Sequence, residues 1–507
     1  MAQSLSGRST GAVAKELRQV ARGGAYYSIG TIASMLIQFA AGVLLVRVLT
    51  VGEYGDFSLA NSTVTLLAMI SLVGFQNGLS RFVVQGSSQP GYHRGTAVAT
   101  PLAVSAITSL IMTIVIFAGA GLIAEFFAKP ALEMVFRYLS ITILPMALIR
   151  TLNAVFRGLQ DQRAKVLFDD ISFNTSRLVL LGFVFVFGMH FEAVLIVYVL
   201  ATWVSLAAYV GYFLRYAPGG DALRIDWKYA GELVRFCLPL LGFAVLSNLM
   251  IWQISTILGF YHESEQVALF TAPQRLTNFV PVPLLSLAYM YLPIASTLTA
   301  LEDREALAGL YRSVTRWAFW ITFPALLYLL FDAEFLLRTI FGEKYLPATD
   351  VLRALAVGSA FHTFLGPNGM TLIALGESKM IFYSSLVSVI VALCLGLLLV
   401  PASGALGAAI ALALGGCLSN TFVSVVLYAR YRLHPFSSGY LWPLLLTGAV
   451  GSGLAIVLRR MDVDSFGFLL IFLPSVLVTL VASIVFTDGL DESDRTLFKR
   501  VRKRLGR

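Results

Sequence analysis

The sequence predicts an all-α integral membrane protein, and three observations carry this prediction. About fourteen apolar stretches, each roughly 20 residues long, follow one another from Gly24 to Phe486, and a helix needs about 20 apolar residues to cross a bilayer. Hydrophobic residues make up 58% of the 507 residues, and charged residues only 13%. Lys and Arg gather in alternate connections, which is typical of the cytoplasmic side of a membrane protein.

The predicted spans can be located by their first residues. They begin near Gly24, Phe57, Thr96, Ala131, Val166, Ala193, Leu233, Val267, Leu310, Leu352, Ile381, Ala405, Tyr440 and Phe466. An even number of spans places both termini on one side, and the basic residues make that side cytoplasmic. The basic residues assigned to cytoplasmic connections include Arg157, Arg312 and Arg316. We therefore expect a multi-pass protein of the cell (plasma or inner) membrane.

Internal repetition divides the predicted spans into two lobes. Glu53–Ala60 resembles Glu265–Ala272, and Gly158 and Gly376 each fall in a predicted cytoplasmic hairpin, so a unit of six spans recurs after about 215 residues. Because six is even, the two lobes are parallel repeats. The predicted parts are a cytoplasmic amphipathic N-terminus (1–23), an N-lobe (24–215), a cytoplasmic connector (216–232), a C-lobe (233–432), two additional spans (433–487) and a basic cytoplasmic tail (488–507).

The net charge of +9 follows mostly from the cytoplasmic bias. Its densest patch is Lys499–Arg504 in the tail. A basic segment beside a membrane is attracted to anionic lipid headgroups by about 1 kcal/mol per residue. We therefore expect anionic membrane lipids, and not nucleic acid, to be the partner of this tail.

No motif in the sequence indicates catalysis. Cys237, Cys394 and Cys417 lie in apolar spans at no metal-binding spacing, and the five histidines are scattered. The sequence contains neither a GxSxG elbow nor a GxxxxGK[ST] phosphate loop. We expect no catalytic residues, no metal site and no cofactor, and we do not expect the protein to be an enzyme.

Arginines inside apolar spans are the first candidates for a functional site. An ionisable side chain deep in lipid costs about 2.5 to 3.5 kcal/mol on insertion scales, so it usually faces a protein interior or a watery cavity. Arg177 and Arg275 lie near the middle of their spans, one in each predicted lobe, and we expect them to line a cavity. Arg47, Arg137 and Arg150 lie near span ends, where a long side chain can reach the headgroups. Guanidinium binds phosphate or carboxylate oxygens in pairs, which favours a phosphate-bearing ligand, although pairing with Asp or with carbonyls would give the same pattern.

Amide side chains surround Arg275. Gln274 and Asn278 lie beside it, and Asn248 and Gln253 lie in the preceding span. Amides hydrogen-bond the hydroxyls of sugars, but they also join helices to one another in lipid. These four residues are therefore candidates for contacts to a glycan or for helix packing.

Two carboxylates accompany Arg177. Asp169 and Asp170 precede it in the same predicted span, and seven residues separate Asp170 from the arginine, so the two share one helix face at about 10 Å. Either carboxylate could balance the charge of the arginine or bind a coupling proton or Na⁺.

The chain resembles the oligosaccharide (O-antigen or polysaccharide) flippases of the multidrug/oligosaccharidyl-lipid/polysaccharide exporter (MOP) superfamily. The resemblance rests on the hairpin Leu49–Phe57, the segment Arg157–Gln160 and the segment Ala272–Leu276, together with the span layout. It implies two six-helix lobes around a cavity, two added helices, and transport of a polyprenyl- or dolichyl-(pyro)phosphate-linked oligosaccharide to the outer leaflet. It also implies that Arg275 corresponds to the arginine in the eighth span of such flippases, and that glycan polymerase or ligase machinery is a further candidate partner.

Two other functions compete with this interpretation. A drug or metabolite cation antiporter of the same superfamily would keep the two lobes, but twelve spans and acidic sites would be expected. A membrane-embedded glycan polymerase or ligase would be expected to carry catalytic groups on a sizeable outer loop. The longest predicted outer connection, from about Phe331 to Asp350, contains no evident catalytic set.

Overall fold

The computed structural model describes residues 30, 33–86, 94–159, 161–216, 224–461 and 463–487. Every regular element in these ranges is a helix. In this part of the chain 10 helices are long and apolar enough to cross a membrane, or up to 11 if the bent pair Val282–Ala288 and Met290–Ala300 forms one span. The all-α membrane fold is thus confirmed, while the count of about fourteen spans stays a prediction. The predicted N-terminal segment 1–23 and the tail 488–507 lie outside the described residues.

The chain forms two compact units, Met1–Asn248 and Leu249–Arg507. The division falls inside the long helix α10 (Trp227–Tyr261). Leu233 and Cys237 of α10 are fully buried in the hydrophobic core of the first unit. The start of the predicted seventh span therefore packs with the first unit, and the predicted lobe boundaries remain predictions.

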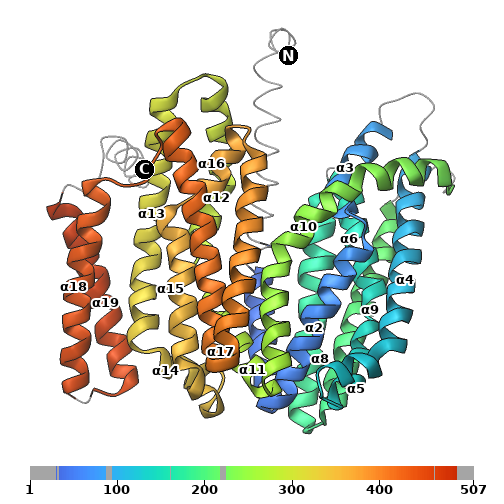
Figure 1. The fold of residues 1–507 in the computed structure, drawn as a ribbon, viewed down its shortest axis with the longest axis horizontal. Helices are drawn as coiled ribbons and strands as arrows, with labels where there is room; N and C mark the ends of the chain where they lie inside the picture. The colour runs from blue at the N-terminus through green and yellow to red at the C-terminus, as the bar shows by residue number, and fades with distance from the viewer. Residues whose placement is uncertain are drawn as a thin grey trace. The chain divides into compact units, whose positions relative to one another are not determined.

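The first unit consists of helices that follow one another along the chain (Figure 1). They are Ala33–Val48, α2 (Val51–Ser71), α3 (Phe75–Gly86), α4 (Arg94–Phe126), α5 (Ala131–Ser140), α6 (Ile143–Gly158), α7 (Gln162–Ala164), the π-helix η2 (Lys165–Ser172), α8 (Phe173–Phe187), α9 (Phe191–Tyr216) and the first part of α10. A capping box begins α2, because the Thr50 side chain accepts a hydrogen bond from the Glu53 backbone N–H and Glu53 accepts one from Thr50 N–H. The acidic residue in the predicted hairpin motif thus fixes a helix start.

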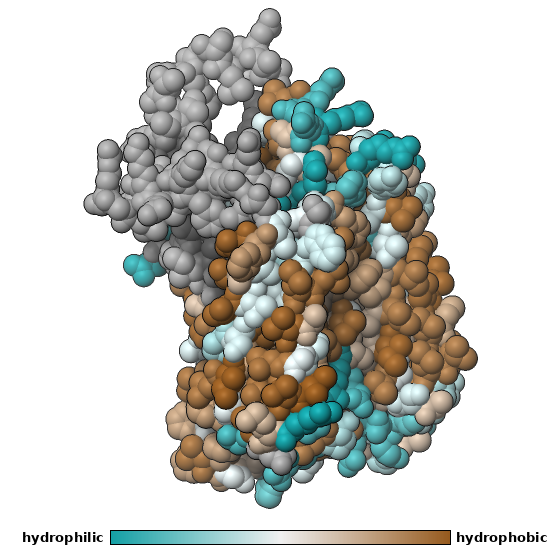
Figure 2. All heavy atoms as spheres, turned by 90° about the vertical axis from the view of Figure 1, so that its left-hand side faces the viewer, coloured by the Kyte–Doolittle hydropathy of each residue, from teal (hydrophilic) through white to brown (hydrophobic). Residues whose placement is uncertain are grey.

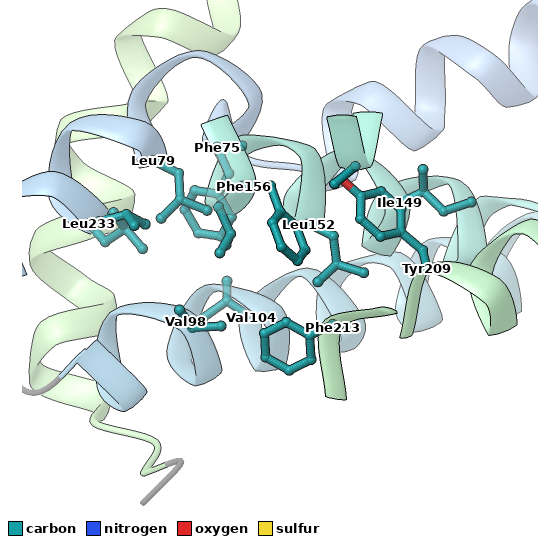
Figure 3. Packing of buried hydrophobic residues seen from close by; sticks show 14 of the residues in the cluster. Phe75, Leu79, Val98, Val104, Ile149, Leu152, Phe156, Tyr209, Phe213 and Leu233 are labelled. Atoms are coloured by element: carbon teal, nitrogen blue, oxygen red, sulfur yellow. The ribbon is translucent and has the colours of Figure 1, made fainter. Parts of the chain in front are cut away.

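The core of the first unit joins α3, α4, α6, α9 and α10 (Figure 3). Phe156 of α6 lies at its centre, with its ring stacked on Tyr209 at 5.6 Å and edge-on to Phe213 at 6.4 Å between centroids. Such aromatic pairs contribute about 0.5–1.5 kcal/mol each beyond burial. This packing fixes α6 against α9, and three of the polar residues described below, Arg150, Asn153 and Tyr209, lie on these two helices.

The second unit follows the same pattern of successive helices. Beyond α10 they are α11 (Ser264–Thr277), α12 (Val282–Ala300), α13 (Arg304–Phe331), α14 (Ala333–Ile340), the 3₁₀-helix η3 (Glu343–Ala348), α15 (Thr349–Leu365), α16 (Asn368–Ala374), α17 (Ser378–Tyr431), α18 (Ser438–Arg460) and α19 (Ser465–Phe486). Two helices meet within α17 at Gly404, whose backbone is not helical (φ 53°, ψ −130°). The predicted spans beginning near Ile381 and Ala405 fall on these two halves.

The last two helices, α18 and α19, pack on α13. Tyr328 of α13 contacts Phe468 and Phe472 of α19, whose rings stack on each other at 4.9 Å. Arg459 of α18 donates a hydrogen bond to the Phe331 carbonyl at the end of α13, where a cation is favourable. Large hydrophobic side chains of this pair are exposed, among them Leu445, Phe466 and Val478, and the side of the molecule seen in Figure 2 is largely hydrophobic. That distribution is the one a bilayer requires.

Gly158 and Gly376, the two glycines that suggested a repeat, are required for different structural reasons. A Cβ on Gly158 would lie 2.6 Å from Val83 Cβ and 3.0 Å from the Ser80 carbonyl oxygen, so α3 and α6 could not approach as closely. Gly376 has open space around its Cα but a φ of +82°, which other residues rarely adopt. One position needs glycine for packing and the other for backbone conformation.

Candidate functional site

The predicted fifth span begins as a π-helix and not as a regular α-helix. Lys165–Ser172 form η2, which continues directly into α8. π-helical turns are rare and often occur at functional sites. The Ser205 hydroxyl of α9 donates a hydrogen bond of 2.5 Å to the Phe168 carbonyl, which fixes η2 to its neighbour. Asp169 and Asp170 therefore lie on this irregular backbone.

Asp169 belongs to a hydrogen-bonded chain of side chains from three helices. The Tyr209 hydroxyl of α9 donates to Asn153 Oδ1 of α6 at 2.7 Å. Asn153 Nδ2 in turn donates to Asp169 Oδ2 at 2.5 Å. Arg150, one turn before Asn153 on α6, attracts the Asp169 carboxylate electrostatically. The structure thus brings together the predicted residues Arg150 and Asp169, and it adds two neutral residues that hold them.

Asp170 faces a different set of partners. Its carboxylate lies 3.9 Å from Lys165 Nζ, and both side chains are partly exposed. Its backbone carbonyl accepts a hydrogen bond of 2.6 Å from Asn174 Nδ2, and Asn174 also contacts Ser34 Oγ of the first helix at 3.4 Å. The two neighbouring aspartates therefore differ: one is held by an asparagine and an arginine, and the other lies beside a lysine.

Arg177 is held inside the first unit. Only 6% of it is exposed, and its guanidinium donates to Asn174 Oδ1 at 3.1 Å and to the Gln38 carbonyl at 3.5 Å. The guanidinium also lies over the rings of Phe173 (5.2 Å) and Tyr198 (5.8 Å). Asn174 therefore links Arg177 to the backbone carbonyl of Asp170. The sequence analysis expected the side chains of Asp170 and Arg177 to share one face of a regular helix.

These residues form what we call the η2 cluster. It consists of Ser34, Gln38, Arg150, Asn153, Lys165, Asp169, Asp170, Asn174, Arg177 and Tyr209. Chemically it combines cationic, anionic and amide groups inside an apolar unit. No set of three or more His, Cys, Asp and Glu side chains within the described ranges could hold a metal ion.

The predicted residues of the second unit are dispersed along α10 and α11. Arg275 and Gln274 are half-buried near the end of α11, and Asn278 is exposed directly after it. Gln253 Nε2 donates to the Val389 carbonyl of α17 at 2.8 Å, so this amide joins two helices.

The two remaining predicted residues belong to the first unit and are exposed. Asn248 donates to the Ala244 carbonyl on its own helix at 3.2 Å and lies 3.5 Å from Met69 Sδ. Arg47 lies near the end of Ala33–Val48.

One buried arginine was assigned to a loop by the sequence analysis. Arg316 is only 1% exposed, in the middle of α13, and its guanidinium lies over the Trp320 ring at 5.5 Å. The helix and its candidate span begin at Arg304, so Arg316 lies inside the span and not in a connection. Trp320, one helical turn after Arg316, was the sequence feature that could have indicated a buried arginine. Asn153 was also missed, although its spacing of three residues from Arg150 places both on one helix face.

Comparison of the sequence with known families and proteins gives two matches. Residues 20–299 match the family described as "Polysaccharide biosynthesis protein". The teichuronic acid biosynthesis protein TuaB of Bacillus subtilis (strain 168) is 30% identical over 73 residues. That alignment covers 14% of this chain and only 15% of TuaB.

Solved transporter structures share the fold over most of the chain. The lipid II flippase MurJ in its inward closed conformation has a TM-score of 0.74 at 13% identity, covering 95% of this chain and 100% of MurJ. An inward-facing multidrug resistance MATE transporter of the MOP superfamily has a TM-score of 0.67 at 16% identity, covering 79% and 94%. A MOP superfamily transporter from Pyrococcus furiosus has a TM-score of 0.56 at 16% identity, covering 80% and 95%. These neighbours are transporters and flippases, and the family match covers more than half of the sequence. The chain belongs to the polysaccharide biosynthesis protein family and has the fold of MOP-superfamily transporters.

Proposed function

We propose that the protein is a flippase that carries a polyprenyl- or dolichyl-(pyro)phosphate-linked oligosaccharide from the cytoplasmic to the outer leaflet. Family membership and the full-length likeness to the lipid II flippase support this proposal. The structural observation that carries it is the set of charged and amide side chains maintained within apolar helices, with Arg150 and Asp169 at its centre. Groups this costly to place in a membrane indicate a polar cargo or a coupled ion.

The physical need for such a protein is clear. Phosphate and sugar hydroxyls moving unaided through hydrocarbon would lose their hydrogen bonds to water. An arginine-bearing cavity supplies replacement partners, and alternating access can expose it to each side in turn while the prenyl chain stays in lipid. In this proposal Arg275 binds phosphate, and Gln274, Asn278 and Asn248 contact sugars. The bond from Gln253 to α17 favours a role in helix packing for that residue.

We assign ion coupling to the η2 cluster. A proton or Na⁺ on Asp169 would neutralise the carboxylate that Arg150 attracts and that Asn153 hydrogen-bonds. The contacts between η2 and α6 would then differ between the ion-bound and the ion-free state of Asp169. Coupling of ion binding to transport requires two such conformations with different affinity for the ion. Asp169→Asn keeps the shape of the side chain but removes its charge, and we expect it to abolish the dependence of transport on the ion gradient.

Transport of a lipid-linked oligosaccharide tests the proposal directly. Wild type and Arg275→Ala are reconstituted in liposomes that carry a fluorescent lipid-linked oligosaccharide, and an impermeant quencher reports how much label changes leaflet. We expect translocation by the wild type and a loss of at least about tenfold in Arg275→Ala, because a charge-assisted contact contributes roughly 1.5–3 kcal/mol. Arg338→Ala is the matched control, since Arg338 is exposed on the short helix α14 and makes only a distant pair with Glu343.

The competing functions give different results in the same liposomes. Export of a cationic dye without movement of the oligosaccharide would favour a drug or metabolite cation antiporter, the function that the likeness to MATE transporters keeps open. Growth of the glycan chain would favour a membrane-embedded polymerase or ligase. The connection from 332 to 348, where such an enzyme would be expected to carry its catalytic groups, folds instead into the short helices α14 and η3.

We further propose a cell (plasma or inner) membrane location with both termini cytoplasmic. Anionic lipids are the proposed partner of the basic tail, and glycan polymerase or ligase machinery that of the transporter. Impermeant labelling of single cysteines placed after residue 2 and before residue 507 in intact cells tests the orientation, because both sites should remain unlabelled until the membrane is opened.

A further inference from the structure

A cavity of about 440 Å³ lies between α4 and α5, outside the η2 cluster. Phe117 of α4 lines one side, and Pro130, Glu133, Arg137 and Tyr138 line the other. Its volume is within the range of small-ligand sites. The residues that line it come from two consecutive helices joined by a short hairpin, so it belongs entirely to the first unit.

The polar groups of this cavity form a defined arrangement. Arg137 Nη2 and Glu133 Oε1 are 2.6 Å apart, one turn from each other on α5, and the guanidinium lies 6.0 Å from the Phe117 ring centroid. The Tyr138 hydroxyl donates a hydrogen bond to Glu192 in the first turn of α9. The side chains of Arg137 and Glu133 nevertheless remain 53% and 41% exposed. One cation, one carboxylate and two aromatic rings therefore surround an accessible space, and a second carboxylate, that of Glu192, lies behind Tyr138.

The surroundings indicate that the cavity faces lipid. Only 17% of the apolar window of α4 is buried within the protein. Leu122 and Phe126, which lie between Phe117 and the end of α4, are 73% and 62% exposed. An ion pair beside such an apolar surface lies near the membrane interface, where long and aromatic side chains meet the lipid headgroups.

We infer that this cavity binds the headgroup of a phospholipid with a primary amine, that is, a phosphoethanolamine group. The five N–H donors of Arg137 can bind the phosphate while one of them keeps its contact with Glu133. Glu133 accepts hydrogen bonds from the ammonium, and Glu192 adds negative charge behind Tyr138. The excess of carboxylates disfavours an anionic headgroup, and a trimethylated amine has no N–H to donate. Phe117 and the exposed face of α4 contact the acyl chains.

Lipid retention measured by native mass spectrometry tests this inference. The full-length protein in detergent is equilibrated with equal amounts of phosphatidylethanolamine, phosphatidylcholine and phosphatidylglycerol, and the lipids that stay bound are counted. We expect phosphatidylethanolamine to be retained about tenfold over phosphatidylcholine, the ratio that corresponds to one additional charge-assisted hydrogen bond. Glu133→Gln should reduce this preference, and Arg137→Ala should reduce retention of phospholipids at this site.

Two controls make the result decisive. Arg338→Ala removes an exposed arginine of the second unit and should leave the preference unchanged. Unchanged unfolding temperatures show that the α5 variants remain folded, and Arg137→Lys, which keeps the charge, should recover part of the retention. Equal retention of the three lipids by the wild type, or a preference that persists in both α5 variants, would overturn the inference. The outcome does not depend on transport, so failure of the proposed function would not affect it.

Discussion

Tyr209 of α9 donates a 2.7 Å hydrogen bond to Asn153 of α6, and this bond orients the asparagine amide toward Asp169. Tyr209 is fully buried, so its hydroxyl can obtain this hydrogen bond only from the protein interior. Tyr209 thereby helps to position the carboxylate of Asp169 through Asn153, without a direct contact to it. The proposed ion coupling at Asp169 therefore depends on this bond as well as on the carboxylate.

The first prediction concerns this bond. Tyr209→Phe leaves the stacking on Phe156 but removes the donor to Asn153, and we expect it to lower stability by about 1–2 kcal/mol because a buried acceptor loses its partner. Thermal unfolding in detergent measures the effect. Tyr383→Phe, at an exposed tyrosine of α17, is the matched control and should change the unfolding temperature little. Equal stability of both variants would show that the bond contributes nothing.

The second prediction concerns Arg177. Arg177→Lys keeps the positive charge but cannot donate from a planar fork to Asn174 and the Gln38 carbonyl, so we expect a loss of about 1.5–3 kcal/mol. Unfolding temperature and transport are measured on the same preparation. If Arg177 acts mainly by stabilising the helix packing, the unfolding temperature and the transport rate should both decrease. Full stability with abolished transport would instead assign Arg177 to ligand binding.

The third prediction separates the two repeat glycines. Gly158→Ala should cost about 1–3 kcal/mol because its Cβ overlaps Val83, and adding Val83→Ala should recover part of that loss. Gly376→Ala should cost about 1–2 kcal/mol through its φ of +82°, and no change in a neighbouring side chain should relieve it. Gly182→Ala, in α8 with nothing within 4 Å of its Cβ, is the control. A double-mutant cycle of unfolding temperatures shows whether relief is confined to the first site.

The fourth prediction is a pH dependence at the start of α17. Glu377 Oε1 accepts hydrogen bonds from Arg430 Nη1 at 2.7 Å and from the Tyr431 hydroxyl at 3.0 Å, and these bonds lower the pKa of the carboxyl below its usual 4.5. A carboxylate with a lowered pKa stabilises the folded state above the unfolded value, and that stabilisation is lost as the pH falls through the folded value. The contribution of Glu377 should therefore be complete at neutral pH and should disappear below pH 4.5.

Glu377→Gln measures this contribution. The difference in unfolding temperature between wild type and variant should be constant at neutral pH and should shrink as the pH is lowered below 4.5. Glu343→Gln is the control, because that side chain is 82% exposed and lies 3.9 Å from its arginine. A difference that grows toward low pH would contradict the assigned direction.

Several features of the site could be predicted from the sequence because they depend on local composition. A charged residue in a long apolar stretch is visible without any structure, which is why Arg150, Asp169 and Arg177 were all identified. Their partners were not, since Tyr209 lies 56 residues from Asn153 and reaches it only through the packing of α9 on α6. Arg316 was assigned to a connection because it follows Arg304 and Arg312, and basic residues near a span end are typical of a cytoplasmic loop.

The sequence by itself determined that this is a helical membrane protein, because hydrophobic transfer acts on each stretch of about 20 residues independently. The start of α2 is also encoded locally, because the capping box of Thr50 and Glu53 is completed within four residues, although the span was predicted to begin near Phe57 and α2 begins at Val51. Only the tertiary structure decided that Lys165–Ser172 form a π-helix and that Asn153 and Asn174 hold the charged residues. The reason is that a π-helix and a hydrogen bond between helices are stable only when distant segments pack together, and no local pattern specifies which segments those are.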